Sequence, residues 1–273
     1  MIIQHNIAAI NSYRNLGVNQ SGLSKNLEKL SSGYRINRAG DDAAGLAISE
    51  SMRSQINGLN QAASNANDAI GLIQTAEGAL TETHSMLQRL KTLAVQSANG
   101  VYDSTARGNI QTEAQALQDE IDRIAKNTDF NTVKPLSMGG NMTFQIGPSG
   151  AETIPVPQQD MTSSALGISG VATALSGATG TNANKAIASI DTAIKNVSTY
   201  RAKLGAAQNR LEHTVNNLKV TAENITAAES RIRDTDMADE ITKYTKNNIL
   251  LQAAQSMLAQ ANAAPQGVLS LLQ

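Results

Sequence analysis

The chain has 273 residues, with 22 basic and 23 acidic side chains and a net charge of −1. This balance gives no sign of the clustered basic surface that binds nucleic acid, so we expect no nucleic-acid partner. The chain contains no cysteine, which excludes disulfide bonds and thiolate chemistry. It also lacks tryptophan and has only two phenylalanines, so its core must consist largely of Ala, Leu and Ile, which suit packing of helix against helix.

The N-terminal part of the chain shows helical periodicity. Apolar residues recur at helical spacing in four segments: 3–10, 23–30, 80–94 and 110–124. We expect four glycines to interrupt this pattern: Gly33, Gly40, Gly45 and Gly58. The segment 37–45 is predicted to be a bend between two helices, and a second turn is predicted near 100–104, with Asp103 or Ser104 as the next N-cap.

The middle of the chain, 129–182, contains four of the five prolines and both phenylalanines, which favours irregular or β structure. Two short β-rich runs flank Gly147–Gly150 and predict a β-hairpin near 140–158. Apolar residues then keep helical spacing over 190–232, a helix on the order of 60 Å long. The predicted fold class is therefore mainly α: a long helical coiled-coil bundle with a small β-hairpin region in the middle of the chain.

Both ends of the chain are almost free of charge. Residues 1–13 carry no charged side chain apart from His5, and residues 247–273 carry none. We predict a C-terminal helix of about 16–20 residues before Pro265. In one interpretation the two terminal helices pack on each other; in the other, both ends are buried against further copies of the chain. The expected assembly residues are Ile3, Ile7, Ile10, Leu250, Ala254, Met257, Leu258, Ala261, Leu269, Leu271 and Leu272.

No group of residues predicts catalysis, a cofactor or a metal site. The three histidines lack the neighbours that complete a metal motif: His5, His84 and His213. Asp41 and Asp42 are adjacent loop residues beside two arginines, so we expect them to cap a helix or form ion pairs. The first residues lack the pattern of a secretory signal peptide, and no apolar run is long enough for a bilayer, so we expect neither a cleaved signal nor membrane insertion.

Several long motifs resemble one known family. They occupy residues 3–11, 30–49, 74–80, 87–97, 210–214, 223–237 and 257–262. On these motifs the chain resembles bacterial flagellin over about 1–134 and 183–273. Only about fifty residues separate the two regions, so it resembles a short form that lacks large outer domains.

The resemblance implies a structural role and not an enzyme. Flagellins polymerise into the flagellar filament, a helical homopolymer used for swimming, after export without a cleaved signal peptide to the outside of the cell. Residues 1–43 with 231–273 would form the terminal coiled-coil domain of the inner tube, and 44–182 with 183–230 the outer-tube helical bundle. Implied partners are an export chaperone and the cap and junction proteins. A hook–filament junction protein of the flagellum, which shares the terminal helices, is the alternative.

The resemblance also implies recognition by the host Toll-like receptor for flagellin. The matching receptor-binding positions in this sequence are Leu87, Gln88, Arg89, Leu93, Gln96 and Glu113. For Leu87 and Leu93, packing inside the bundle is the alternative interpretation. Arg89 is expected to be exposed.

Overall fold

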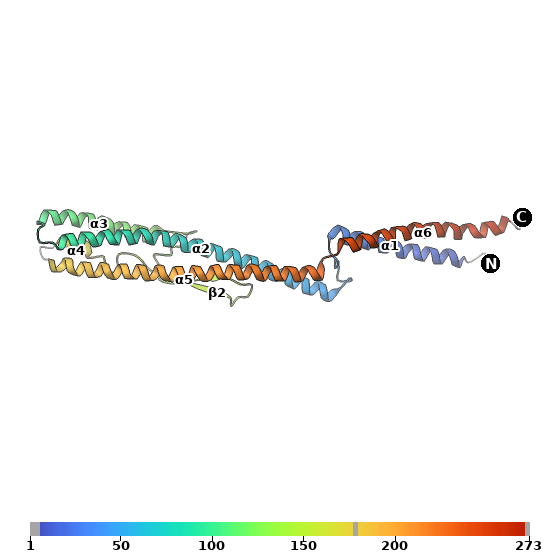
Figure 1. Ribbon diagram of the computed structural model, residues 1–273, viewed down its shortest axis with the longest axis horizontal. Coiled ribbons are helices and arrows are strands. Elements are labelled where there is room, and N and C mark those ends of the chain that lie inside the picture. Colours follow the sequence, from blue (N-terminus) through green and yellow to red (C-terminus); the bar gives the residue numbers. More distant parts are fainter. Residues whose placement is uncertain (1–5, 177–179, 271–273) are drawn as a thin grey trace. The chain divides into compact units, whose positions relative to one another are not determined.

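The computed structural model describes residues 6–176 and 180–270 (Figure 1). In these residues the chain forms six helices and one two-stranded sheet, so the prediction of a mainly α fold is confirmed. The elements are α1 (Ile7–Ser32), α2 (Ala43–Ala98), α3 (Ser104–Asn127), β1 (Gly140–Gln145), β2 (Thr153–Gln158), α4 (Val171–Leu175), α5 (Gly180–Arg233) and α6 (Met237–Ser270). No helix of this described part is both long and apolar enough to cross a membrane.

Contacts divide the chain into two compact units. We call the described residues up to Ile56 and from Glu223 onward the terminal unit, and those from Asn57 to Ala222 the central unit. Helices α2 and α5 each contribute residues to both units. The predicted boundaries at 43 and 231 concern the inner and outer tubes of a filament, and they stay predictions.

The core of the central unit is a continuous apolar cluster built from α2, α3, α4, α5 and the hairpin. Its largest fully buried side chains include Leu80 and Leu87 of α2, Ile121 of α3 and Tyr200 of α5. The heptad ladder predicted at 110–124 lies along this core, because Ile110, Ala114 and Ile121 are all buried. Aliphatic side chains at helical spacing therefore supply the burial that drives the helices together.

The predicted β-hairpin is confirmed. Strands β1 and β2 pair antiparallel, with Phe144 opposite Ile154 and Met142 opposite Val156. Ile154 and Val156 are buried against the helices, whereas the alternate residues of β2 are exposed or half-buried. The phenol of Tyr200 lies against the carbonyl oxygen of Pro157 at 3.1 Å. Burial raises the pKa of Tyr200 to about 12, so the phenol stays protonated as a donor.

Two of the predicted glycine interruptions are wrong. Gly45 and Gly58 both lie inside α2, whereas Gly33 ends α1 in the left-handed conformation at φ 75°. A helical glycine costs about 1 kcal/mol relative to alanine, which packing can offset. A Cβ at Gly58 would lie 2.8 Å from the Cβ of Pro148, so the missing side chain allows the hairpin loop to approach α2.

The prediction that Pro265 ends the C-terminal helix is also wrong, because α6 continues through it to Ser270. Proline cannot donate the hydrogen bond that the carbonyl of residue i−4, here Ala261, normally accepts. In this chain the side-chain amide of Asn6 donates to that carbonyl at 2.7 Å. The Asn6 side-chain oxygen also accepts the N–H of Ala9 at 3.1 Å and caps α1. One residue thus begins α1 and satisfies the carbonyl that Pro265 leaves free.

Candidate assembly site

The two terminal helices, α1 and α6, pack side by side and antiparallel (Figure 1). Besides the Asn6 bond, the Asn19 side chain donates to the carbonyl of Leu250 at 3.4 Å. A Cβ at Gly22 would lie 3.1 Å from the side-chain nitrogen of Asn247, so the missing side chain allows Asn247 of α6 to pack against the backbone of α1. The pairing of the two terminal helices within one chain is therefore confirmed.

This pairing leaves much of the predicted assembly surface uncovered. Ile7 is 61% exposed, Ile10 58%, Leu250 40% and Met257 63%. Three further predicted residues are half-buried: Ala254, Leu258 and Ala261. The remaining predicted residues, Ile3, Leu271 and Leu272, lie outside the described residues, as does the side chain of Leu269.

Sequence reasoning missed several exposed apolar residues of the same helices. Tyr13 and Val18 on α1 and Ile249 on α6 are all more than half exposed. They were missed because only one apolar stripe per helix was assigned, although both helices carry apolar residues on several sides. We call seven of the exposed apolar residues on these two helices the terminal apolar surface: Ile7, Ile10, Tyr13, Val18, Ile249, Leu250 and Met257. Large apolar side chains of α6 stay exposed after it has paired with α1, so this helix retains apolar surface that a further partner can bury.

A bend joins α5 to α6 and lies against the segment after α1. The backbone N–H of Arg35 donates to the carbonyl of Arg233 at 2.7 Å, and that of Thr235 to the carbonyl of Gly33 at 3.0 Å. The guanidinium of Arg233 lies 4.7 Å from the ring centroid of Tyr34, which is cation–π distance. These residues come from the motifs of 30–49 and 223–237, and in the structure they hold the bend of the terminal unit.

The adjacent carboxylates of the same motif serve the backbone, as predicted. Asp42 accepts the N–H of Gly45 at 2.9 Å and so caps the first turn of α2. Asp41 accepts the N–H groups of Arg38 at 3.1 Å and Asn37 at 3.2 Å. These two backbone donors hold the pKa of Asp41 below its usual value. The lowered pKa keeps the Asp41 carboxylate ionised, and an ionised carboxylate is the form that accepts these two backbone hydrogen bonds.

The predicted receptor residues separate into buried and exposed groups. Leu87 and Leu93 are buried in the core of the central unit, which favours packing as their role. Arg89 on α2 and Glu113 on α3 are exposed and form an ion pair at 2.6 Å. Gln88 is exposed as well. Gln96 is half-buried, and its side chain donates to the hydroxyl of Tyr102 at 3.1 Å.

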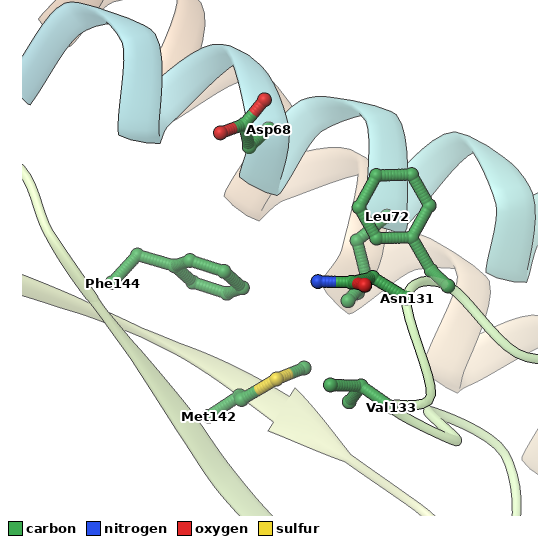
Figure 2. Close-up of a pocket in the computed structure, with 7 residues that line it drawn as sticks. Asp68, Leu72, Asn131, Val133, Met142 and Phe144 are labelled. Carbon is green, nitrogen blue, oxygen red and sulfur yellow. The ribbon is translucent and has the colours of Figure 1, made fainter.

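The central unit also contains a shallow pocket of about 400 Å³ between α2 and the hairpin. Figure 2 shows Met142 and Phe144 projecting from the hairpin into this space and Leu72 facing it from α2. Asp68 is the one titratable residue among those lining it. A single carboxylate beside apolar side chains offers packing surface but no acid–base pair. In the described residues, no three His, Asp or Glu side chains form a group that could hold a metal ion.

Comparison with known families places the molecule. Residues 3–139 match the bacterial flagellin N-terminal helical region, and residues 187–272 match the bacterial flagellin C-terminal helical region. The chain belongs to the bacterial flagellin family. The flagellin of Bacillus subtilis is 52% identical over 303 aligned residues, and the alignment covers 100% of both chains. The flagellar filament 33 kDa core protein of Treponema phagedenis is 50% identical over 285 residues, again with 100% of both chains covered.

As a flagellin, the chain is a structural subunit of the flagellar filament, an extracellular appendage. The flagellin resemblance and the short form without large outer domains are thereby confirmed. A solved structure of a flagellar hook-associated protein from Vibrio parahaemolyticus has a TM-score of 0.62, and the match covers 71% of this chain and 100% of that one. Its sequence identity is only 13%, so the likeness shows a shared fold and gives the junction-protein alternative no further support.

Proposed function

We propose that the terminal apolar surface is the surface through which subunits of this flagellin pack against one another in the filament. The observation that carries the proposal is the exposure of large apolar side chains on α1 and α6 after these helices have already paired. Large apolar side chains that stay exposed in such number on two paired helices are typical of a surface that packs against a partner. The contacts are heterologous, because an open helical polymer requires different patches of each copy to meet.

A conservative truncation on this surface tests the proposal. Burying a methionine fully stabilises by about 1.5–3 kcal/mol, and Met257 keeps 63% of its surface available for a partner. Met257→Ala should therefore weaken subunit addition by about 1 kcal/mol, which raises the critical concentration for seeded growth roughly fivefold. The measurement is the subunit concentration that remains in solution at equilibrium with sheared filament seeds.

Met138 provides a matched control. It is 61% exposed, but it lies before β1 in the central unit and outside the terminal apolar surface. Met138→Ala should leave the critical concentration within about twofold of the parent. Equal effects of the two substitutions, or no effect of Met257→Ala, would refute the assignment of this surface. Deleting 254–273 should abolish elongation altogether, while the helical content of the central unit persists in circular dichroism.

Before assembly, we expect another protein to bind the terminal apolar surface and shield it from water. The proposal extends to an export chaperone that binds the terminal helices, to export without a cleaved signal peptide, and to cap and junction proteins at the filament ends. These partners come from the family resemblance. The exposed Met257 and Ile249 support the chaperone step, since apolar side chains at a chain end favour aggregation when uncovered. Chaperone affinity should fall for Met257→Ala and remain unchanged for Met138→Ala.

A second proposal is that the host Toll-like receptor for flagellin recognises the exposed polar cluster of Gln88, Arg89 and Glu113. The receptor itself comes from the family resemblance. What supports the site is that Arg89 and Glu113 form an ion pair across α2 and α3 and remain accessible, with side-chain exposures of 53% and 44%. Leu87 and Leu93 would then act indirectly, by holding the helices that present this cluster.

Arg123 gives a matched control for this second proposal, because it is an exposed arginine on α3 that pairs with Glu120 at 2.5 Å. Arg89→Ala should reduce receptor binding by roughly tenfold, which is typical for loss of a charged hot-spot contact. Arg123→Ala should leave binding unchanged. Surface plasmon resonance with the receptor ectodomain and monomeric protein measures both. Unchanged binding of Arg89→Ala excludes the proposed site.

A further inference from the structure

The turn between α2 and α3 contains an Asn-Gly dipeptide, a pair of residues that can react with each other. The sequence has two Asn-Gly pairs, Asn57-Gly58 and Asn99-Gly100. The first lies inside α2 and the second directly follows its end. In an Asn-Gly pair, the backbone nitrogen of glycine can attack the asparagine side-chain amide, because no Cβ on the glycine obstructs the approach. Whether it does so depends on how the fold holds the two groups.

The geometry around Asn99 favours this attack. Both Asn99 and Gly100 are exposed. The Asn99 side-chain oxygen accepts the N–H of Val101 at 3.3 Å, which folds the side chain back over the Gly100 peptide. Within the described part of the chain, the N–H of Gly100 makes no hydrogen bond that would hold it away from the side chain. The exposed Asn99 side chain and the unengaged Gly100 nitrogen can therefore reach the geometry of attack without breaking a helical hydrogen bond.

We propose that Asn99 is a site of spontaneous, water-dependent backbone modification in the folded protein. Solvent hydroxide removes the proton of the Gly100 backbone nitrogen, and that nitrogen forms a bond to the Asn99 side-chain carbonyl carbon. The bond from this carbon to the amide nitrogen breaks, and the nitrogen leaves as ammonia after taking a proton from water. Water then opens the resulting five-membered imide at either carbonyl, which yields aspartate or isoaspartate at position 99.

Asn57 is protected by its place in the fold. Gly58 lies in the interior of α2, where helical geometry directs its N–H to the carbonyl four residues earlier. A Cβ at Gly58 would lie 2.8 Å from Pro148, so the hairpin loop also restricts movement there. Attack at Asn57 therefore requires local unfolding of α2, whereas attack at Asn99 does not. The same dipeptide should thus react at one position and resist at the other.

The product places a new negative charge at a sensitive position. Residue 99 directly follows the last residue of α2, and an anion at a helix C-terminus is unfavourable. Asp103 already occupies the next N-cap, where its carboxylate accepts the N–H of Ala106 at 2.8 Å. The carbonyl of Asn99 also accepts a hydrogen bond from the Arg107 guanidinium at 3.3 Å. In isoaspartate the backbone runs through Cβ and Cγ of residue 99, which lengthens it by one carbon and converts this carbonyl into part of a free carboxylate. The modification therefore loosens the turn that connects α2 to α3.

The test is incubation of the full-length native protein at physiological temperature and mildly alkaline pH, followed by peptide mapping with mass spectrometry and enzymatic isoaspartate labelling. In the folded protein, the rate of conversion at Asn99 should be at least roughly ten times the rate at Asn57. In denaturant the two sites should react at similar rates. These denatured rates give the intrinsic reactivity of each local sequence, against which the native rates are compared. Equal native rates, or conversion at Asn99 only after denaturation, would overturn the proposal.

Gly100→Ala supplies the matched variant. A Cβ at Gly100 would meet no atom within 4 Å, so the substitution leaves the fold intact. Its added Cβ hinders the attacking nitrogen, and conversion at Asn99 should fall by roughly tenfold while Asn57 stays unchanged. Conversion of Gly100→Ala at the parent rate would show that the backbone nitrogen is not the attacking group, and the proposal would fail. Circular dichroism of the variant confirms that any change is not caused by unfolding.

Discussion

The hydrogen bond from Asn6 to the carbonyl of Ala261, which Pro265 leaves without a helical donor, allows a sharp test of how α1 and α6 are held together. Asn6→Asp preserves the oxygen that caps α1 but removes the amide that donates to the carbonyl of Ala261. Since Pro265 cannot donate to that carbonyl, the substitution leaves it unpaired in a partly buried place. We expect the substitution to lower the free energy of opening the paired ends of α1 and α6 by about 1–3 kcal/mol.

Pro265→Ala should rescue this loss. Alanine restores a backbone N–H that can donate to the carbonyl of Ala261, so Asn6→Asp should cost less in the Pro265→Ala background. The effect of the added charge and the helix propensity of alanine appear on both sides of the cycle and cancel. The remaining coupling free energy should be about 1 kcal/mol. Native-state hydrogen exchange of amides in α1 measures it, because the ends can open without global unfolding.

Asn19 is the matched control for this cycle. Its side chain also donates to a carbonyl of α6, that of Leu250, but Ala254 lies four residues further on and supplies the normal helical donor. Asn19→Asp should therefore show no coupling to Pro265→Ala. A coupling near zero for Asn6, or an equal coupling for Asn19, would refute the argument that Asn6 compensates for the proline.

Two further predictions concern the core of the central unit. The pKa of Tyr200 is raised from 10.0 to about 12 in the folded state, so between these pH values the folded state holds more protons than the unfolded state. The free energy of unfolding should therefore fall by on the order of 2 kcal/mol as pH rises from 10 to 12. Urea titrations at several pH values measure this dependence, and Tyr200→Phe should remove it. A dependence that persists in Tyr200→Phe contradicts the assignment to Tyr200. Leu87→Ala should lower the free energy of unfolding by about 2–5 kcal/mol, because it empties a fully buried site. Val95→Ala, on the exposed side of the same helix, should change it by about 0.5 kcal/mol or less, and a similar loss for both would show that Leu87 is not a core residue.

Local and periodic features were predictable from the sequence. The helical spacing at 110–124 and 190–232, the Asp103 cap and the β-hairpin all appear in the structure, because each depends on residues a few positions apart. The lack of charge at the ends likewise predicted surfaces that need a partner. Their assignment to a filament depended on family motifs, since periodicity and charge describe any helical assembly.

The tertiary structure decided the features that depend on residues far apart in the chain. Helix α2 passes through Gly58 because the hairpin loop packs there through Pro148, ninety residues later in the chain. Helix α6 passes through Pro265 because Asn6, 255 residues before Ala261, supplies the donor that the Ala261 carbonyl lacks. Periodicity placed Leu87 and Leu93 on a helix but did not show that neighbouring elements bury them. For Gly58 and Pro265 the local energetic cost was evident from the sequence, whereas its compensation came from a distant residue that only the folded chain brings near.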